Sequence, residues 1–153
     1  MSSPVDNPDA CAVHLNRVFA VGRDYLFQCF TDPSLLLRWW GPEGASCVNV
    51  HSDAVAGGTY RFEIVGDDSG ERNVVSGEYL VVEPPQRLVF SWAWDATAAE
   101  VTQVELTFNA ISPTTTELVL VHSRFPNSDR AAAHNQGWDS SFDCLEELLG
   151  SKA

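Results

Sequence analysis

The feature that most constrains the fold is one long stretch of helical periodicity at the C-terminal end of the chain. Most of the preceding sequence alternates apolar and polar residues instead. Side chains recur there at spacings of three and four residues, as along one face of an amphipathic helix. They are Ala131, His134, Trp138, Phe142, Leu145 and Leu149. With Ser128 as the N-cap and Gly150 at the end, we expect a helix of roughly 20 residues, about 30 Å long.

The rest of the chain is dominated by strand patterns. Alternation of apolar and polar residues predicts strands at 11–19, 46–50, 59–65, 74–83, 87–94, 101–110 and 115–122. Between the first two strands, residues 23–30 and 33–39 are expected to form short helices. Asp32 would cap the second helix, with Pro33 at its first position. Short turns between the later strands predict antiparallel neighbours.

This order of elements predicts an α+β fold of the helix-grip type. A curved antiparallel sheet of about six or seven strands would surround the long C-terminal helix, with two short helices after the first strand. The sheet must bury its apolar face, and a straight helix cannot seal a curved sheet along its whole length. We therefore expect a cavity between them. Residues 1–9 are expected as a flexible tail and 10–153 as a single domain.

Charge and composition exclude several classes of function. Nine basic residues against 21 acidic ones give a net charge of −12, which argues against nucleic acid and anionic membranes as partners. No apolar run approaches the ~20 residues of a membrane span, and the first ten residues lack a signal-peptide pattern. We expect a cytoplasmic protein.

The cysteines show no spacing typical of a metal site. Cys11, Cys29, Cys47 and Cys144 are far apart and include no C-x-x-C pair. We expect them to be small buried side chains. No metal and no other cofactor is predicted.

Aromatic residues supply most candidates for a ligand site. The chain has five Trp and eight Phe, and such side chains line both cores and ligand pockets. The cavity candidates are Trp40, Tyr60, Phe62, Tyr79, Trp92, Phe108, His122, His134 and Trp138, with Phe90 and Trp94 as further wall residues. Strand alternation groups residues by face without saying which face is inward. The segment Trp39-Trp40-Gly41-Pro42 is either a lid or, as we favour, a hydrophobic corner.

Two histidines have competing interpretations. His122 shares a strand face with Leu118 and Leu120, and His134 lies on the inward stripe of the helix. Imidazoles beside a cavity could shuttle protons or hydrogen-bond a ligand carbonyl. We favour the alternative that both are structural and bonded to backbone carbonyls. The chain carries no nucleophile elbow, phosphate loop or dinucleotide fingerprint, so no catalytic residue is assigned.

Fragments along most of the chain carry a family resemblance. They are Arg17-Val18-Phe19, Phe30-Thr31-Asp32-Pro33, Arg38-Trp39-Trp40-Gly41-Pro42, Gly57-Gly58-Thr59-Tyr60-Arg61-Phe62, Gly77-Glu78-Tyr79, Pro85-Gln86-Arg87-Leu88-Val89-Phe90-Ser91-Trp92, Leu118-Val119-Leu120-Val121-His122 and His134-Asn135-Gln136-Gly137-Trp138 with Leu145 beyond. Together they resemble the START-like (SRPBCC) superfamily, in the branch related to the C-terminal domain of the activator of the 90-kDa heat-shock protein ATPase. The resemblance implies a helix-grip fold with a hydrophobic cavity.

Three functions are compatible with these observations. The first is a small-molecule-binding protein whose aromatic cavity takes a hydrophobic ligand. The second, implied by the resemblance, is a co-chaperone-like protein with a chaperone as partner and a role in stress response. The third is a polyketide-cyclase-like enzyme using His122 or His134. A monomer and a homodimer are both open, because a shared fold fixes neither assembly nor site chemistry.

Overall fold

Seven antiparallel strands form one sheet in this protein. The structure, a computed structural model, describes residues 11–41 and 44–152. The strands are β1 (Val13–Phe19), β2 (Ala45–Ser52), β3 (Thr59–Gly66), β4 (Arg72–Glu83), β5 (Arg87–Trp94), β6 (Thr102–Ser112) and β7 (Thr115–Ser123). They lie in the order β1-β7-β6-β5-β4-β3-β2. The predicted α+β fold with an antiparallel sheet is confirmed.

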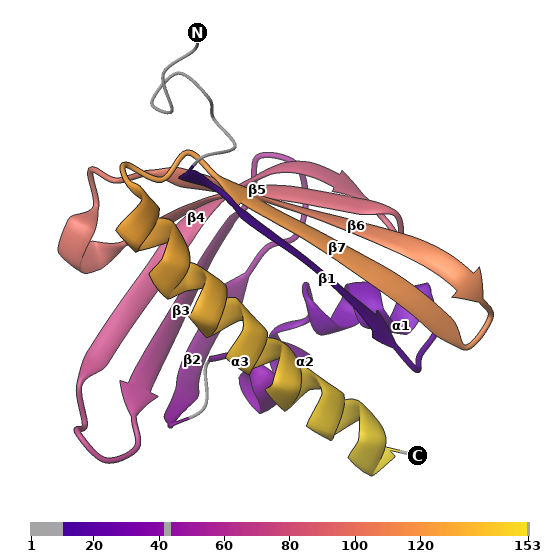
Figure 1. Ribbon diagram of the computed structural model, residues 1–153. Helices are drawn as coiled ribbons and strands as arrows, with labels where there is room; N and C mark the ends of the chain where they lie inside the picture. Colours follow the sequence, from indigo (N-terminus) through magenta and orange to yellow (C-terminus); the bar gives the residue numbers. More distant parts are fainter. Residues whose placement is uncertain (1–10, 42–43, 153) are drawn as a thin grey trace, which may run out of the picture.

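The sheet curls because its strands twist and the register is irregular in β2, β4 and β6. The register shifts between Cys47 and Asn49 in β2 and between Tyr79 and Val81 in β4. An irregularity of this kind bends a strand and increases its local twist. In Figure 1 strands β2 to β4 consequently run away from the direction of β5 to β7 and leave a concave face.

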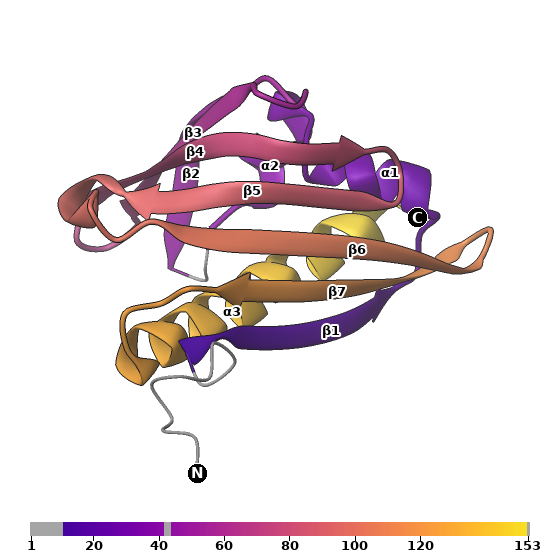
Figure 2. The same cartoon turned by 90° about the horizontal axis from the view of Figure 1, so that it is seen from above.

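Two short helices carry the chain from one edge of the sheet to the other. They are α1 (Arg23–Cys29) and α2 (Pro33–Trp39), and they join the two edge strands, β1 and β2. Asp32 caps α2 as predicted, since its carboxylate accepts a hydrogen bond of 2.9 Å from the backbone N–H of Ser34. Figure 2 shows α1 near the C-terminal end of the chain.

The long C-terminal helix, α3 (Ser128–Lys152), lies across the concave face (Figure 1). It is 25 residues long, so it does not end at Gly150 as expected. The predicted cap was also wrong by one residue. The side chain of Asn127 accepts a hydrogen bond of 2.9 Å from the backbone N–H of Arg130, and Ser128 is the first helical residue. An Asn in this position satisfies a free amide of the first turn as well as a Ser does.

The core lies between the concave face and the helices. Alternate residues are buried in β3, β6 and β7, which confirms that the predicted faces of these strands are shared faces. The largest fully buried side chains are Tyr60, Tyr79, Phe19, Phe108, Phe142, Leu26, Leu36, Leu88, Leu106, Leu118, Leu120 and Leu145. Of the cysteines, Cys29 is buried, whereas the other three are only half-buried, contrary to expectation. The predicted tail, 1–9, and Pro42 lie outside the described residues.

Candidate functional site: a tryptophan-lined cavity under the first half of the long helix

A cavity of about 240 Å³ lies between α3 and strands β3 and β5, beside the end of α2. Its walls are mainly apolar. Trp40 and Gly41 come from the end of α2, Ile64 from β3, and Trp92 and Trp94 from β5. The α3 side is formed by Ala133, His134, Gly137, Trp138 and Ser141. Four of the five tryptophans of the chain therefore border one space.

Three of these tryptophans form a continuous wall. The ring centroid of Trp138 lies 5.3 Å from that of Trp40 and 5.2 Å from that of Trp92, and Trp40 and Trp92 are 5.9 Å apart. These separations are those of rings in direct contact. Trp94 extends the wall from Trp92, with centroids 5.5 Å apart. The first three rings thus pack against one another at interplanar angles of 46°, 90° and 44° and form an inclined aromatic wall.

The opposite side of the cavity is open because α3 presents small residues there. Ala133, Gly137 and Ser141 are spaced by four, which places them on one face of the helix. A Cβ atom added to Gly137 would meet no heavy atom within 4 Å. The cavity therefore exists where small helix residues face large indole rings.

The residues at the end of α2 both hold this helix against α1 and form part of the cavity wall. The indole N–H of Trp39 donates a hydrogen bond of 2.9 Å to the backbone carbonyl of Cys29, which ties α2 to α1 as the predicted corner requires. Gly41 then turns the chain with a φ of 109°, a conformation that favours glycine. Trp40, between them, packs on Phe62 with ring centroids 4.7 Å apart and borders the cavity.

His122 is a fully buried, fully hydrogen-bonded residue at the end of β7. Its Nδ1 accepts a hydrogen bond of 2.9 Å from the indole N–H of Trp138, so the proton of the neutral ring is on Nε2. Nε2 lies 2.7 Å from the hydroxyl oxygen of Thr102, to which it donates, and this hydroxyl donates to the backbone carbonyl of Trp92. Burial and the nearby ring of His134 lower the pKa of His122 to about 2.

His134 forms a second imidazole–indole pair on α3. Its Nδ1 lies 2.8 Å from the backbone carbonyl of Arg130 and must donate to it, which leaves Nε2 to accept 2.9 Å from the indole N–H of Trp94. Burial lowers the pKa of His134. Both rings are therefore neutral and have both nitrogens engaged. His134 is bonded to a backbone carbonyl, as the structural interpretation predicted, whereas His122 reaches one only through Thr102.

The indole N–H of Trp92 differs from those of its neighbours. Among the described residues, its Nε1 is the one buried side-chain nitrogen or oxygen atom without a hydrogen-bond partner. Trp92 is 5% exposed, and it borders the cavity. A buried donor left unsatisfied costs about 1–3 kcal/mol.

The cavity candidates from the sequence fall into two groups. Trp40, Trp92, His134 and Trp138 border the cavity, and so does Trp94 from the further wall residues. The other five were also expected to line the cavity, but they pack in the core around it. They are Tyr60, Phe62, Tyr79, Phe108 and His122.

The packing of these five residues explains their position. The hydroxyl of Tyr60 donates to the carbonyl of Ser91 at 2.5 Å, and that of Tyr79 lies 2.7 Å from the hydroxyl of Ser52. Phe108 packs against the ring of Phe27 at 5.2 Å. All five are buried, each at a point along its strand where the interior is filled. Ile64, Ala133, Gly137 and Ser141 were missed, and the four-residue spacing of the last three is the signal that could have found them.

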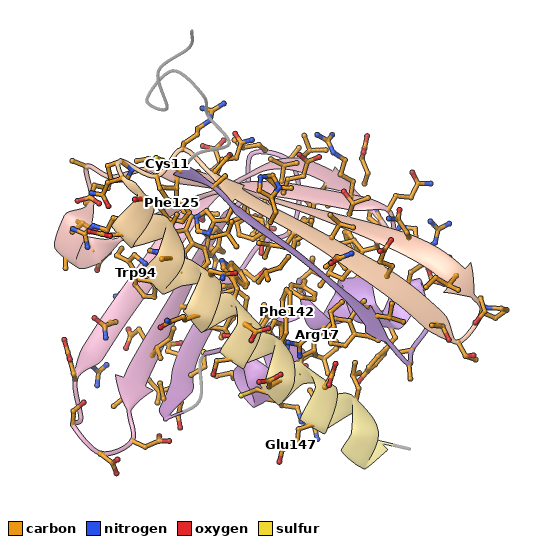
Figure 3. The ribbon with its side chains drawn as sticks, viewed as in Figure 1. Cys11, Arg17, Trp94, Phe125, Phe142 and Glu147 are labelled. Carbon is orange, nitrogen blue, oxygen red and sulfur yellow. The ribbon has the colours of Figure 1, made fainter. Side chains whose placement is uncertain are left out.

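A separate set of contacts holds the second half of α3 against β1. Arg17 of β1 forms ion pairs of 2.7 Å with Asp139 and 2.8 Å with Asp143. Its guanidinium carbon lies 5.7 Å from the ring centroid of Phe142. Figure 3 shows Arg17 and Phe142 close together under this half of the helix, with Trp94 near the opposite end.

The described residues were also compared with the requirements of a metal site and of a membrane-spanning helix. Within 11–41 and 44–152, no cluster of three or more His, Cys, Asp or Glu side chains could hold a metal ion. None of the described helices combines the length and the apolar character that a membrane crossing requires.

Comparisons with known proteins agree with this architecture. The family described as Activator of Hsp90 ATPase homolog 1-like protein matches residues 20–150. The AHSA1 protein of Silicibacter pomeroyi is 29% identical, with a TM-score of 0.83 over 93% of this chain and 99% of that one. A protein of Chromobacterium violaceum is 26% identical, with a TM-score of 0.80 over 90% and 96%. No curated protein matches the chain significantly.

The match spans strands β2 to β7, α1, α2, α3 as far as residue 150 and the cavity between them, so it covers the described architecture apart from β1 and the last two residues of α3. It also agrees with the fragments that resembled this branch of the START-like superfamily. The chain belongs to the Activator of Hsp90 ATPase homolog 1-like family.

Proposed function

We propose that the protein binds an apolar aromatic small molecule in the cavity under the first half of α3. The observation that carries this proposal is a space of about 240 Å³ bordered by four tryptophans. Apolar cavities of about 150 Å³ hold a benzene molecule. The present cavity therefore suits a compound of about two fused rings.

The position of the cavity supports access from solvent. Trp40, Trp92 and Trp138 are 4–6% exposed, whereas Trp94 is half-buried and Ala133 is exposed. The cavity thus reaches the surface between the end of β5 and the start of α3. A ligand could enter there and stack on the aromatic wall without displacing the helix.

The test uses naphthalene as a two-ring probe and a variant that fills the space. Naphthalene at 100 times its dissociation constant should stabilise the wild type by about 2.7 kcal/mol, measured by thermal unfolding and tryptophan fluorescence. Gly137→Leu places a side chain where a Cβ atom meets nothing within 4 Å, and it should abolish this stabilisation. Ala132→Leu, at an exposed position outside the cavity lining, is the matched control and should retain it.

Two results would end this proposal. One is a wild type that neither naphthalene nor larger aromatic compounds stabilise. The other is equal binding to the wild type and to Gly137→Leu, because a ligand that tolerates a filled cavity binds elsewhere.

The two alternatives have less support from the described residues. A cyclase-like reaction would need an imidazole nitrogen available to the ligand, but both nitrogens of His122 and both of His134 are engaged. A chaperone partner would need an extended apolar surface. The large exposed apolar side chains among the described residues are instead distributed over α2, four strands and the connections beside them. They are Val18, Leu37, Val48, Val55, Leu80, Val101 and Ile111.

A further inference from the structure

The opening of the cavity lies between the end of β5 and the first half of α3. Four residues of the cavity wall are only 4–6% exposed, namely Trp40, Ile64, Trp92 and Trp138. The lining residues that are half-buried or exposed lie instead on the two rims of the opening. They are Trp94 on β5 and Ala133, His134 and Gly137 on α3. A ligand that enters from solvent therefore passes between these two elements.

One hydrogen bond joins the two rims. The indole N–H of Trp94 on β5 donates to Nε2 of His134 on α3 at 2.9 Å. The other ring nitrogen of His134 donates to the carbonyl of Arg130 in the preceding turn, which fixes the imidazole on its helix. The bond between Trp94 and His134 therefore narrows the opening for as long as it is made.

Trp94 is held less closely than the rings deeper in the wall. Among the described residues, its ring contacts are with Trp92, at 5.5 Å between centroids, and with His134, at 6.3 Å. Trp94 and His134 border the cavity and also a second space of about 30 Å³. Trp138, in contrast, is packed between Trp40 and Trp92, and close packing prevents movement of a ring. The indole of Trp94 thus has room to turn once its hydrogen bond breaks.

The protonation state of His134 controls this bond. A neutral imidazole can donate from Nδ1 and accept at Nε2, whereas a protonated imidazole carries a hydrogen on both nitrogens. Protonation of His134 therefore removes the acceptor of Trp94 and places two N–H groups opposite each other. Burial lowers the pKa of His134, so the neutral ring is the main form at neutral pH and protonation occurs below about pH 6.5.

Titratable and charged groups face His134 from α3, from the connection before β6 and from β7. Arg130, one turn earlier on α3, disfavours the protonated ring, and Glu100, ion-paired with Arg130 at 3.3 Å, favours it. The ring centroid of His122 on β7 lies 5.3 Å from that of His134, and the pKa of His122 is about 2. Of the two histidines, His134 therefore takes up its proton first as the pH falls.

We propose that the hydrogen bond between Trp94 and His134 is the gate of the cavity: a ligand enters and leaves when this bond opens, and protonation of His134 opens it. This inference rests on the proposed function and adds control of ligand exchange by acid. The gate acts on binding and release alike, because the ligand passes the same opening in both directions.

The experiment measures the rate constants for binding and release of naphthalene by stopped-flow tryptophan fluorescence. Naphthalene has no titratable group, so its own charge does not change with pH. His134→Phe keeps an aromatic ring at the opening but removes the acceptor of Trp94. His51→Phe, the same substitution at an exposed position outside the cavity lining, is the matched control.

At about pH 7.5, where the wild-type imidazole is neutral, His134→Phe should raise both rate constants together. The expected factor is roughly three- to tenfold, the range for the loss of one neutral hydrogen bond. The dissociation constant then changes little, whereas loss of a simple wall contact raises the release rate alone. Acidification to about pH 5.5 should raise both rate constants in the wild type and in His51→Phe and leave those of His134→Phe unchanged.

A direct measurement keeps the inference testable even if His134→Phe does not fold. In NMR spectra of the wild type, the indole N–H resonance of Trp94 should move upfield as the pH falls, because its hydrogen bond is lost. The midpoint of this movement should be that of the change in the rate constants. The indole resonance of Trp138, whose acceptor is His122, should stay in place and shows that the fold is intact.

The outcomes separate this inference from the proposed function. If naphthalene does not bind the wild type, the proposed function fails and the gate fails with it. If naphthalene binds with equal rate constants in the wild type and His134→Phe, the binding function stands and the gate is overturned. A Trp94 resonance that stays in place while His134 titrates would overturn the gate in the same way.

Discussion

The two halves of α3 are attached to the sheet in different ways. In the second half, Phe142 and Leu145 are fully buried, and Phe142 packs on Phe19 and Phe30 with ring centroids 5.9 and 6.4 Å apart. In the first half, the residues that face the sheet include Gly137, and the helix stands over a cavity. Hydrogen bonds from Trp94 to His134 and from Trp138 to His122 tie this half to β5 and β7.

This difference shows how one helix can serve two purposes. Large apolar side chains fill the interior and supply most of the stabilisation, because burial of apolar area scales with their size. Directional hydrogen bonds hold the other half at a fixed distance without filling the space. We infer that the second half of α3 stabilises the fold and that the first half shapes the site.

The largest expected effect is a loss of stability when a buried ring is removed from the second half of α3. Phe142→Ala should lower the free energy of unfolding by about 3–5 kcal/mol, because it removes a fully buried ring from a closely packed interior. Urea unfolding monitored by circular dichroism measures this loss. A loss of less than about 1 kcal/mol would be typical of a surface position and would contradict the contrast between the halves.

The histidines that hold the first half of α3 should make the free energy of unfolding depend on pH. The pKa of His122 is about 2 in the folded protein and ~6.5 in the unfolded chain, so the unfolded state binds more protons between these values. Stability is therefore full above about pH 6.5 and falls as the pH decreases, by about 2 kcal/mol at pH 5 from this residue. The lowered pKa of His134 acts in the same direction.

His122→Asn isolates this effect. The variant should be less stable than the wild type at pH 7.5, by roughly 1–3 kcal/mol, and its stability should depend less on pH between 5 and 7. Carboxylates of the unfolded chain titrate near pH 4, so they contribute little in this window. The exposed His51 provides the control, because His51→Asn should retain the pH dependence of the wild type. Equal slopes in all three proteins would show that His122 is not the cause.

The smallest expected effect is a gain in stability. Gly137→Ala should raise the free energy of unfolding by up to about 1 kcal/mol, because alanine is the better helix former and the added methyl group meets open space. Gly77→Ala is the opposite case. A Cβ atom there would lie 2.0 Å from the carbonyl oxygen of Ser91, so this variant should be destabilised in the same unfolding assay. Destabilisation of both variants would mean that the space beside Gly137 is filled.

Much of the fold was predictable because its signals are local. The alternation of Tyr60, Phe62 and Ile64 predicted that they share a face, which the structure buries, and the cap at Asp32 predicted the start of α2. The three- and four-residue spacing of Trp138, Phe142 and Leu145 predicted which side of α3 is buried. A periodic pattern acts over a few residues of one chain segment, so it can be read without knowledge of the partner element.

The site could be predicted only in part. Trp40, Trp92, His134 and Trp138 were predicted to border the cavity and do so, whereas Tyr60 and Phe108 face the same interior where it is filled. Periodicity gives the face of a residue but not the distance to the element opposite. That distance depends on the curl of the sheet and the course of α3.

The sequence by itself therefore determined the order of elements, which residues of an element share a face, and the family of the chain. Only the tertiary structure decided where helix and sheet separate, which nitrogen of each imidazole carries the proton, and that the N–H of Trp92 has no acceptor. The physical reason is that each of these properties depends on the positions of groups far apart in the chain. His122 and Trp138 meet across two elements, and Trp94 and His134 are 40 residues apart.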